Sequence, residues 1–182
     1  MLIGFGLLLE GVIFNYARRV ELELRQWFDP NEGLKQSPHI TFKTPFTVNS
    51  MEPFANYLDE LAATTPPFDV TIKGVGAFAP HVLFLDVQPS QGLFALHTRV
   101  LDDLDHQFQV QPGRFEGQQM KFHSTVAIGD PTEGDLVAAQ EWLRRDSPQF
   151  TFTVQSFGLF YRLEPDGGWI ICHQSGLREV GS

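Results

Sequence analysis

Two short stretches of this sequence carry a histidine and a threonine two positions apart. The first reads His-Ile-Thr-Phe from His39, and the second reads His-Ser-Thr-Val from His123, 84 residues later. An imidazole has an unperturbed pKa of about 6.5, so it can act as a base or as an acid near neutral pH. A threonine hydroxyl can donate a hydrogen bond to an oxygen on which negative charge develops. Two such pairs facing each other would suit acid–base cleavage of a phosphodiester.

Both stretches have the composition of β-strands, with β-branched and aromatic residues and with proline or glycine at the edges. Side chains two positions apart on a strand point to the same face, so His39 and Thr41 should share a face, with Lys43 next. His123 and Thr125 should do the same in the second stretch. The predicted catalytic residues are His39, Thr41, His123 and Thr125. Lys43 is predicted to contact the substrate, with a solvated strand edge as the alternative.

Other interpretations of the histidines are weaker. A single histidine of this kind is more often a core residue bonded to backbone, and only the pairing favours catalysis. No spacing typical of a metal site involves the remaining four, His81, His97, His106 and His173. Surface or capping positions are predicted for these four, and neither a metal ion nor another cofactor is predicted.

The elements predicted around the two motifs follow the same order twice: strand, helix, strand, strand. Residues 68–78 can be laid over residues 150–160 with identical Phe, Thr, Gly and Phe at four of eleven positions. Two similar halves, about 38–104 and 120–182, would bring the His-x-Thr strands together around a pseudo-twofold axis. The predicted strands are 2–10, 38–43, 68–75, 81–87, 120–127, 149–155, 157–163 and 168–173. The predicted helices are 12–28, 52–63, 90–104 and 131–145, and 105–119 is predicted to be a long connecting loop.

Length and composition favour one two-lobed domain spanning residues 1–182. Hydrophobic residues make up 42% and charged residues 19% of the chain, which allows a large core. The net charge of −9 argues against binding a long nucleic-acid duplex but permits a small phosphorylated ligand. The single cysteine, Cys172, excludes an intramolecular disulfide and fits a reducing compartment such as the cytoplasm. The apolar segment 1–10 is too short to span a bilayer and is predicted to be a buried strand.

These features resemble the two-histidine phosphoesterase superfamily, which includes the 2′-5′ RNA ligase-like proteins and the RNA cyclic phosphodiesterases. Its signature is a pair of His-hydrophobic-Thr/Ser-hydrophobic motifs, roughly 80 to 90 residues apart. The motif at His39 fits in full, whereas Ser124 in the second motif stands where the family usually has an apolar residue. The resemblance covers essentially the whole chain. It implies a bilobal α+β fold in which two pseudo-symmetric antiparallel sheets line a central cleft, with the helices outside.

The resemblance also implies a reaction, the metal-independent hydrolysis of a 2′,3′-cyclic phosphate on a nucleotide or an RNA end. One histidine would take a proton from water, and the other would protonate the departing ribose oxygen. The sequence leaves open which histidine has which role. The reverse reaction, 2′-5′ RNA ligation, is the alternative within the enzyme class, and a non-catalytic nucleotide- or RNA-binding module is the alternative outside it. A monomer that does not associate with membranes is expected.

Overall fold

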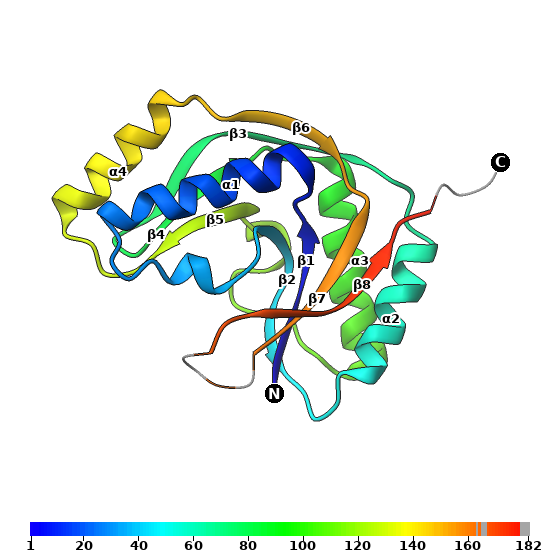
Figure 1. Ribbon diagram of the computed structural model, residues 1–182. Helices are drawn as coiled ribbons and strands as arrows, with labels where there is room; N and C mark the ends of the chain where they lie inside the picture. Colours follow the sequence, from blue (N-terminus) through cyan, green and yellow to red (C-terminus); the bar gives the residue numbers. More distant parts are fainter. Residues whose placement is uncertain (163, 165–166, 179–182) are drawn as a thin grey trace.

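The chain folds into eight β-strands and four α-helices within the residues that the computed structural model describes, 1–162, 164 and 167–178 (Figure 1). Residues 163, 165–166 and 179–182 lie outside the described part, and residue 163 is the last of the strand predicted at 157–163. The strands are β1 (Leu2–Leu8), β2 (His39–Thr47), β3 (Asp69–Phe78), β4 (Val82–Val87), β5 (His123–Ile128), β6 (Gln149–Thr153), β7 (Ser156–Arg162) and β8 (Ile170–Gly176). The α-helices are α1 (Gly11–Glu23), α2 (Glu52–Ala63), α3 (Gln91–Phe108) and α4 (Glu133–Arg145).

The strands form two four-stranded sheets, in which all neighbouring strands are antiparallel. The first sheet has the order β2-β1-β7-β8, and the second sheet has the order β5-β4-β3-β6. The predicted α+β fold with two antiparallel sheets is confirmed. Each sheet carries its His-x-Thr strand, β2 or β5, at one edge, and these two edge strands contact each other. The two motifs therefore meet at the seam between the sheets.

The halves predicted at 38–104 and 120–182 do not each build one sheet. The strands β3 and β4 belong to the first half but lie in the sheet of β5, whereas β7 and β8 belong to the second half but lie in the sheet of β2. The reason is β1, which precedes both halves and occupies beside β2 the place that β4 occupies beside β5. The two sheets correspond strand by strand, but the chain crosses between them.

The position of β1 inside its sheet follows from its composition. All seven of its residues are apolar, and residues 3–8 are buried between the neighbouring strands β2 and β7. This confirms a buried strand near the N-terminus, although the strand ends at Leu8. By contrast, β2 lies at an edge, where Pro45 is tolerated because a proline has no N–H to donate to a further strand.

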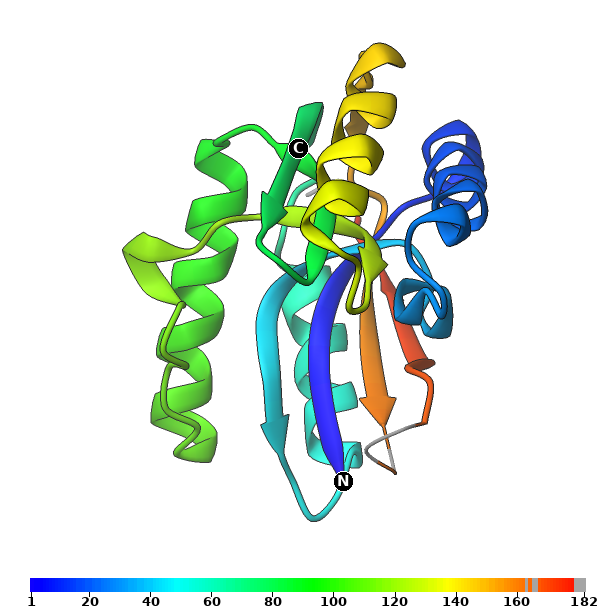
Figure 2. The ribbon, with the colours of Figure 1, turned by 90° about the vertical axis from the view of Figure 1, so that its left-hand side faces the viewer.

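The helices cover the outer faces of the two sheets. The helix α2 packs against β7 and β8, and α3 packs against β2, whereas α1 contacts β5 and α4 contacts β3. In Figure 2, α2 lies behind the strands of the first sheet. Among the described residues, no helix combines the length and the apolar character needed to cross a membrane.

The helix α3 is longer than the sequence predicts. It continues to Phe108, four residues into the segment 105–119 that is predicted to be a loop. The ring of Phe108 lies 4.8 Å from that of Phe54 on α2, centre to centre. Such a tertiary contact stabilises the extra turn, and local helix propensity does not reveal it. The connection to β5 then runs back along α3 before it crosses to β5 (Figure 2).

A buried asparagine ties α1 to the second sheet. The amide nitrogen of Asn31 donates hydrogen bonds to the carbonyl oxygens of Glu21, at 2.9 Å, and Val126, at 3.0 Å. Its amide oxygen accepts hydrogen bonds from the backbone N–H groups of Gly33, at 2.9 Å, and Ile128, at 3.1 Å. These four bonds hold the segment that leads into β2 against β5.

Replacing Asn31 with alanine should lower the free energy of unfolding by about 3 kcal/mol, because four buried backbone groups lose their partner. Urea unfolding of Asn31→Ala measures this effect. The matched control is Asn15→Ala, at an exposed position of α1, which should change the free energy by less than about 0.5 kcal/mol. Equal stabilities of the two variants would contradict the bridging role of Asn31.

Candidate active site

The two histidines occupy equivalent places in the two sheets. His39 is the first residue of β2, and His123 is the first residue of β5. Nδ1 of His39 lies 2.7 Å from the carbonyl oxygen of Ser37, and Nδ1 of His123 lies 2.7 Å from that of Lys121. Because a carbonyl oxygen can only accept a hydrogen bond, each Nδ1 carries a proton. In a neutral ring, Nε2 therefore carries the lone pair that can act as a base.

Burial lowers the pKa of both histidines, because each imidazolium would lose hydration. The pKa of His39 falls to about 4, mainly through burial and to a smaller extent through the charge of nearby His123. The pKa of His123 is lowered by burial and by the charge of Lys121, while the carboxylate of Asp86 acts in the opposite direction. The two rings therefore interact electrostatically, and only His123 has a carboxylate that favours its protonated form.

Each histidine ring packs against a phenylalanine of its own sheet. The ring centre of His39 lies 4.4 Å from that of Phe160 on β7, and the ring centre of His123 lies 5.0 Å from that of Phe78 on β3. Phe78 and Phe160 are also aligned with each other when the two halves of the sequence are overlaid. On β1, Gly6 leaves the space for the first imidazole, since a Cβ there would lie 2.9 Å from Cδ2 of His39. These packing residues orient the rings and are not apparent from the His-x-Thr pattern.

The two threonines follow their histidines on the same faces of the strands. Oγ1 of Thr41 lies 3.1 Å from Nε2 of His39, so its hydroxyl donates to that nitrogen when the ring is neutral. Thr125 is half-buried and lies opposite Phe84 of β4. The structure thus brings His39 and Thr41 into contact, and it places Thr125 in the corresponding position beyond His123.

A small pocket lies next to the first motif. It is lined by His39 and Thr41, by the rings of Phe160 and Trp169, and by the amide of Gln36. Aromatic faces and an amide can bind a nucleobase, and the imidazole and hydroxyl can bind a phosphate. The pocket therefore lies where a ligand would meet His39 and Thr41, the predicted catalytic groups of the first motif.

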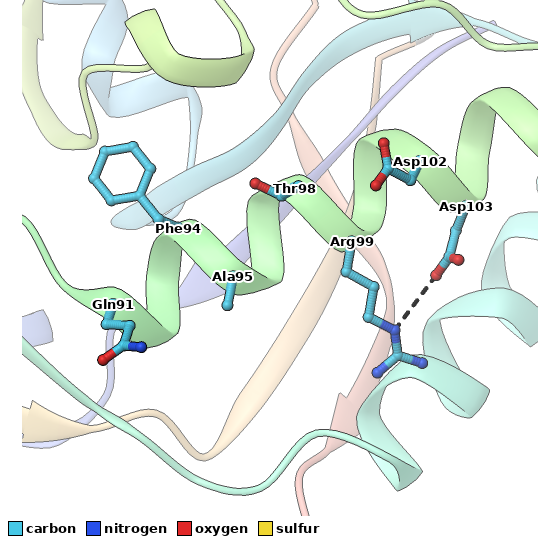
Figure 3. Close-up of a pocket in the computed structure, with 7 residues that line it drawn as sticks. All are labelled: Gln91, Phe94, Ala95, Thr98, Arg99, Asp102 and Asp103. Carbon is cyan, nitrogen blue, oxygen red and sulfur yellow. Dashed lines mark ion pairs between the residues drawn. The ribbon is translucent and has the colours of Figure 1, made fainter.

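A larger and more open hollow lies elsewhere, on the outer surface of α3 (Figure 3). All of its lining residues belong to α3, and Arg99 and Asp103 form an ion pair of 3.5 Å there. No histidine lines this hollow. Within the part of the chain that the structure describes, no three His, Cys, Asp or Glu side chains gather as a metal-binding group.

Lys43 is buried and its charge is paired, so the alternative of a solvated strand edge is wrong. Its Nζ lies 2.6 Å from Oε2 of Glu116, and the two side chains are only 2% and 0% exposed. The other carboxylate oxygen of Glu116 accepts hydrogen bonds from the N–H and the hydroxyl of Thr44, at 2.7 Å each. Burial raises the pKa of Glu116, but the hydrogen bonds from Lys43, Gly113 and Thr44 lower it overall. Lys43 lines the pocket, yet this pairing favours a role in positioning β2 over the predicted contact with substrate.

The predicted surface or capping position is wrong for His97, which is fully buried. Its Nδ1 lies 2.7 Å from the carbonyl oxygen of Phe42, and its Nε2 accepts a hydrogen bond of 2.9 Å from the N–H of Gly117. His97 therefore joins β2 to the connection before β5, beside the pair of Lys43 and Glu116. No spacing in the sequence indicates this role, because both partners are backbone groups. Hydrogen bonds at the surface are made by the other three, His81, His106 and His173.

Ser124, which departs from the family pattern, lies on the core side of β5. It is fully buried, and its hydroxyl has no hydrogen-bond partner among the described residues. Ile40, its counterpart in the first motif, is buried to the same degree. The serine at position 124 therefore changes the packing on the core side of β5. It does not change the opposite face of the strand, which carries His123.

Comparisons with known proteins point to one family. A family model described as the 2′-5′ RNA ligase superfamily matches residues 14–166. A Bacillus cereus protein (strain B4264) with phosphoesterase in its name is 29% identical over 155 residues, which cover 81% of this chain and 83% of the relative. Another, from Bacillus cereus strain ATCC 10987, is 30% identical over 154 residues, with the same coverage of 81% and 83%.

Two solved structures have the same fold. TT0787 of Thermus thermophilus has a TM-score of 0.70 at 15% identity and covers 100% of both chains. LigT of E. coli has a TM-score of 0.64 at 18% identity, covering 97% of this chain and 98% of its own. At these identities, the likeness concerns the fold alone.

The buried ion pair gives a prediction about stability. Replacing Glu116 with glutamine should lower the free energy of unfolding by about 3 to 5 kcal/mol, since it leaves the buried ammonium of Lys43 without a counter-charge. The double variant Lys43→Met, Glu116→Gln should recover at least about 1 kcal/mol of that loss. Urea unfolding of both variants gives these values. As a control, Glu23→Gln breaks an exposed pair with Arg19 and should cost less than about 1 kcal/mol.

A double variant that is less stable than Glu116→Gln would contradict this account of the ion pair.

Proposed function

Since the chain belongs to the 2′-5′ RNA ligase superfamily, we propose that it hydrolyses 2′,3′-cyclic phosphates of nucleotides or RNA ends without a metal ion. The observation that supports this reaction is the pair of equivalent histidines at the seam between the sheets. Each ring is oriented by a backbone carbonyl at 2.7 Å, and each is followed by a threonine on the same face. Such a pair supplies a proton acceptor and a proton donor for one phosphate.

In this proposal, His39 is the general base. The pKa of His39, about 4, keeps the ring neutral near neutral pH. Because Nδ1 carries the proton of the neutral ring, the lone pair lies on Nε2. The ring takes a proton from water as the water oxygen forms a bond to phosphorus. Thr41, 3.1 Å from Nε2, can turn its hydroxyl toward a phosphate oxygen once Nε2 accepts the water proton.

His123 is the general acid in the same proposal. The carboxylate of Asp86 favours its imidazolium form, and a bound phosphate anion would favour it further. As the bond between phosphorus and one ribose oxygen breaks, His123 donates its proton to that oxygen. The product is a 2′-phosphomonoester with a free 3′-hydroxyl, and this choice of bond is carried over from the family. Thr125 donates to a non-bridging oxygen on which negative charge develops.

The ligands of a structural neighbour support a substrate that carries a phosphate group. Crystal structures of E. coli LigT contain 3′-AMP, ATP, NADP⁺ or phosphate, all of which carry a phosphate group. A nucleotide with its phosphate between the two motifs would place its base toward Gln36 and Trp169 in the pocket.

Two other functions use the same site. A ribose hydroxyl in place of water would reverse the reaction and join two RNA ends as a 2′-5′ ligase. A non-catalytic module would bind nucleotides or RNA without turnover. The orientation of both rings with Nε2 available favours catalysis over binding alone, and the excess of water favours hydrolysis over ligation.

A direct test is hydrolysis of a 2′,3′-cyclic mononucleotide in excess EDTA. We expect turnover in the parent protein and a loss of about a hundredfold or more in His39→Ala and in His123→Ala, because each lacks one proton-transfer group. His106→Ala, which changes a surface histidine, is the matched control and should retain full activity. Loss of turnover in EDTA, or unchanged turnover in either motif variant, would contradict the proposal.

The pH dependence of kcat/KM follows from the lowered pKa values. His39 must be neutral, so activity should fall only as pH drops toward about 4, where the ring becomes protonated. His123 must be protonated. Because its pKa is also lowered from the usual value of about 6.5, the alkaline loss of activity should begin at a pH below about 6.5. We therefore expect a bell-shaped profile with an acidic optimum, measured with a cyclic mononucleotide. An optimum above about pH 7.5 would be incompatible with this assignment of acid and base.

A further inference from the structure

A tight turn beside β2 exposes an aromatic ring and a cation. The turn spans residues 113–116 and is closed by a hydrogen bond of 3.1 Å from the N–H of Glu116 to the carbonyl oxygen of Gly113. Its two central residues are Arg114 and Phe115. Both are exposed, and Phe115 is 65% accessible. The guanidinium carbon of Arg114 lies 5.1 Å from the centre of the Phe115 ring.

Hydrogen bonds to buried polar groups hold this turn against β2 and α3. The carboxylate of Glu116 accepts hydrogen bonds from Gly113 of the same turn, at 2.6 Å, and from Lys43 and Thr44 of β2, at 2.6 and 2.7 Å. One residue further along, the N–H of Gly117 donates to the buried His97. Because these contacts hold the turn on both sides of its tip, Phe115 is presented to solvent by a rigid support.

The turn lies next to the proposed catalytic site. Lys43, which anchors it, lines the same pocket as His39 and Thr41. Thr44, the second anchor, is three residues along β2 from Thr41, which corresponds to about 10 Å in a strand. A ligand that fills the pocket and continues along β2 would therefore reach this turn.

The chemistry of the turn suits a single-stranded nucleic acid. An exposed aromatic ring stacks on a base of any identity, and an arginine binds phosphate or stacks on a base. Within the described residues, Arg114 forms no ion pair, so its charge is available to a ligand. The chain as a whole carries a net charge of −9, so a local cation beside the pocket is needed to attract a second phosphate.

We propose that Arg114 and Phe115 bind the nucleotide adjacent to the cyclic phosphate in an RNA strand. Phe115 stacks on its base, and Arg114 contacts its phosphate. This inference rests on the proposed function and narrows its substrate class from nucleotides or RNA ends to the ends of RNA chains. It makes the turn a subsite that a mononucleotide does not occupy.

The test compares two substrates, a 2′,3′-cyclic mononucleotide and an oligoribonucleotide that ends in the same cyclic nucleotide. In Arg114→Ala, Phe115→Ala, kcat/KM for the oligonucleotide should fall about tenfold or more. The value for the mononucleotide should stay within about twofold, since nothing in the pocket changes. The matched control is Leu22→Ala, Arg144→Ala, which removes an exposed apolar residue and an exposed cation from α1 and α4 and should affect neither substrate.

A binding measurement keeps this inference independent of turnover. A fluorescently labelled oligonucleotide with the cyclic end is titrated against His39→Ala alone and against His39→Ala combined with Arg114→Ala or with Phe115→Ala. The anisotropy is recorded at several salt concentrations. Loss of one phosphate contact should reduce the slope of log Kd against log salt by about 0.7 for a single strand.

The outcomes separate the subsite from the catalytic proposal. Absence of hydrolysis with oligonucleotide binding that depends on Arg114 and Phe115 would overturn the proposed function and support the subsite. Equal losses on both substrates would overturn the subsite, as would oligonucleotide binding unchanged by either substitution. Unchanged RNA binding would leave the turn as a surface for a protein partner.

Discussion

The buried ion pair between Lys43 and Glu116 joins β2, which carries His39, to the connection that leads into β5, which carries His123. Lys43 belongs to β2, and Glu116 lies in the connection that leads into β5, seven residues before His123. His97 makes a second link between β2 and this connection through two backbone groups. Both His-x-Thr strands lie at sheet edges, so strand pairing alone leaves the separation of the two rings undetermined. The buried polar network fixes β2 against the connection before β5, and the four bonds of Asn31 hold the segment before β2 against β5 itself.

Separate local contacts give each histidine ring a defined orientation. In each ring, Nδ1 lies close to a backbone carbonyl oxygen, which fixes the proton on that nitrogen. Each imidazole also packs against a phenylalanine of its own sheet: His39 against Phe160 and His123 against Phe78. The two sites differ in their electrostatics, because Asp86 favours the charged form of His123 alone. A nearly symmetric fold thereby supplies two chemically different groups, as transfer of a proton to and from one phosphate requires.

The sequence predicts the elements and the motif pair well, because both depend on local patterns. Alternating residues define β2 and β5, and an uncharged apolar segment defines β1 as a buried strand. The sequence does not predict which strands share a sheet, because β1 precedes the repeat and occupies beside β2 the place that β4 occupies beside β5. The roles of Lys43 and His97 are also missed, since their partners lie far along the chain or are backbone groups without a side-chain signature.

The most direct test of the paired site is NMR of the protein labelled with ¹⁵N in histidine, titrated with a nucleoside 2′-monophosphate. In the free protein near neutral pH, above the lowered pKa values of both rings, His39 and His123 should show the neutral form protonated at Nδ1. On titration, the Nε2 signals of both rings should shift along one saturation curve, because both groups contact one phosphate. A shift of only one ring, or two curves with different midpoints, would contradict a single site built from the two motifs.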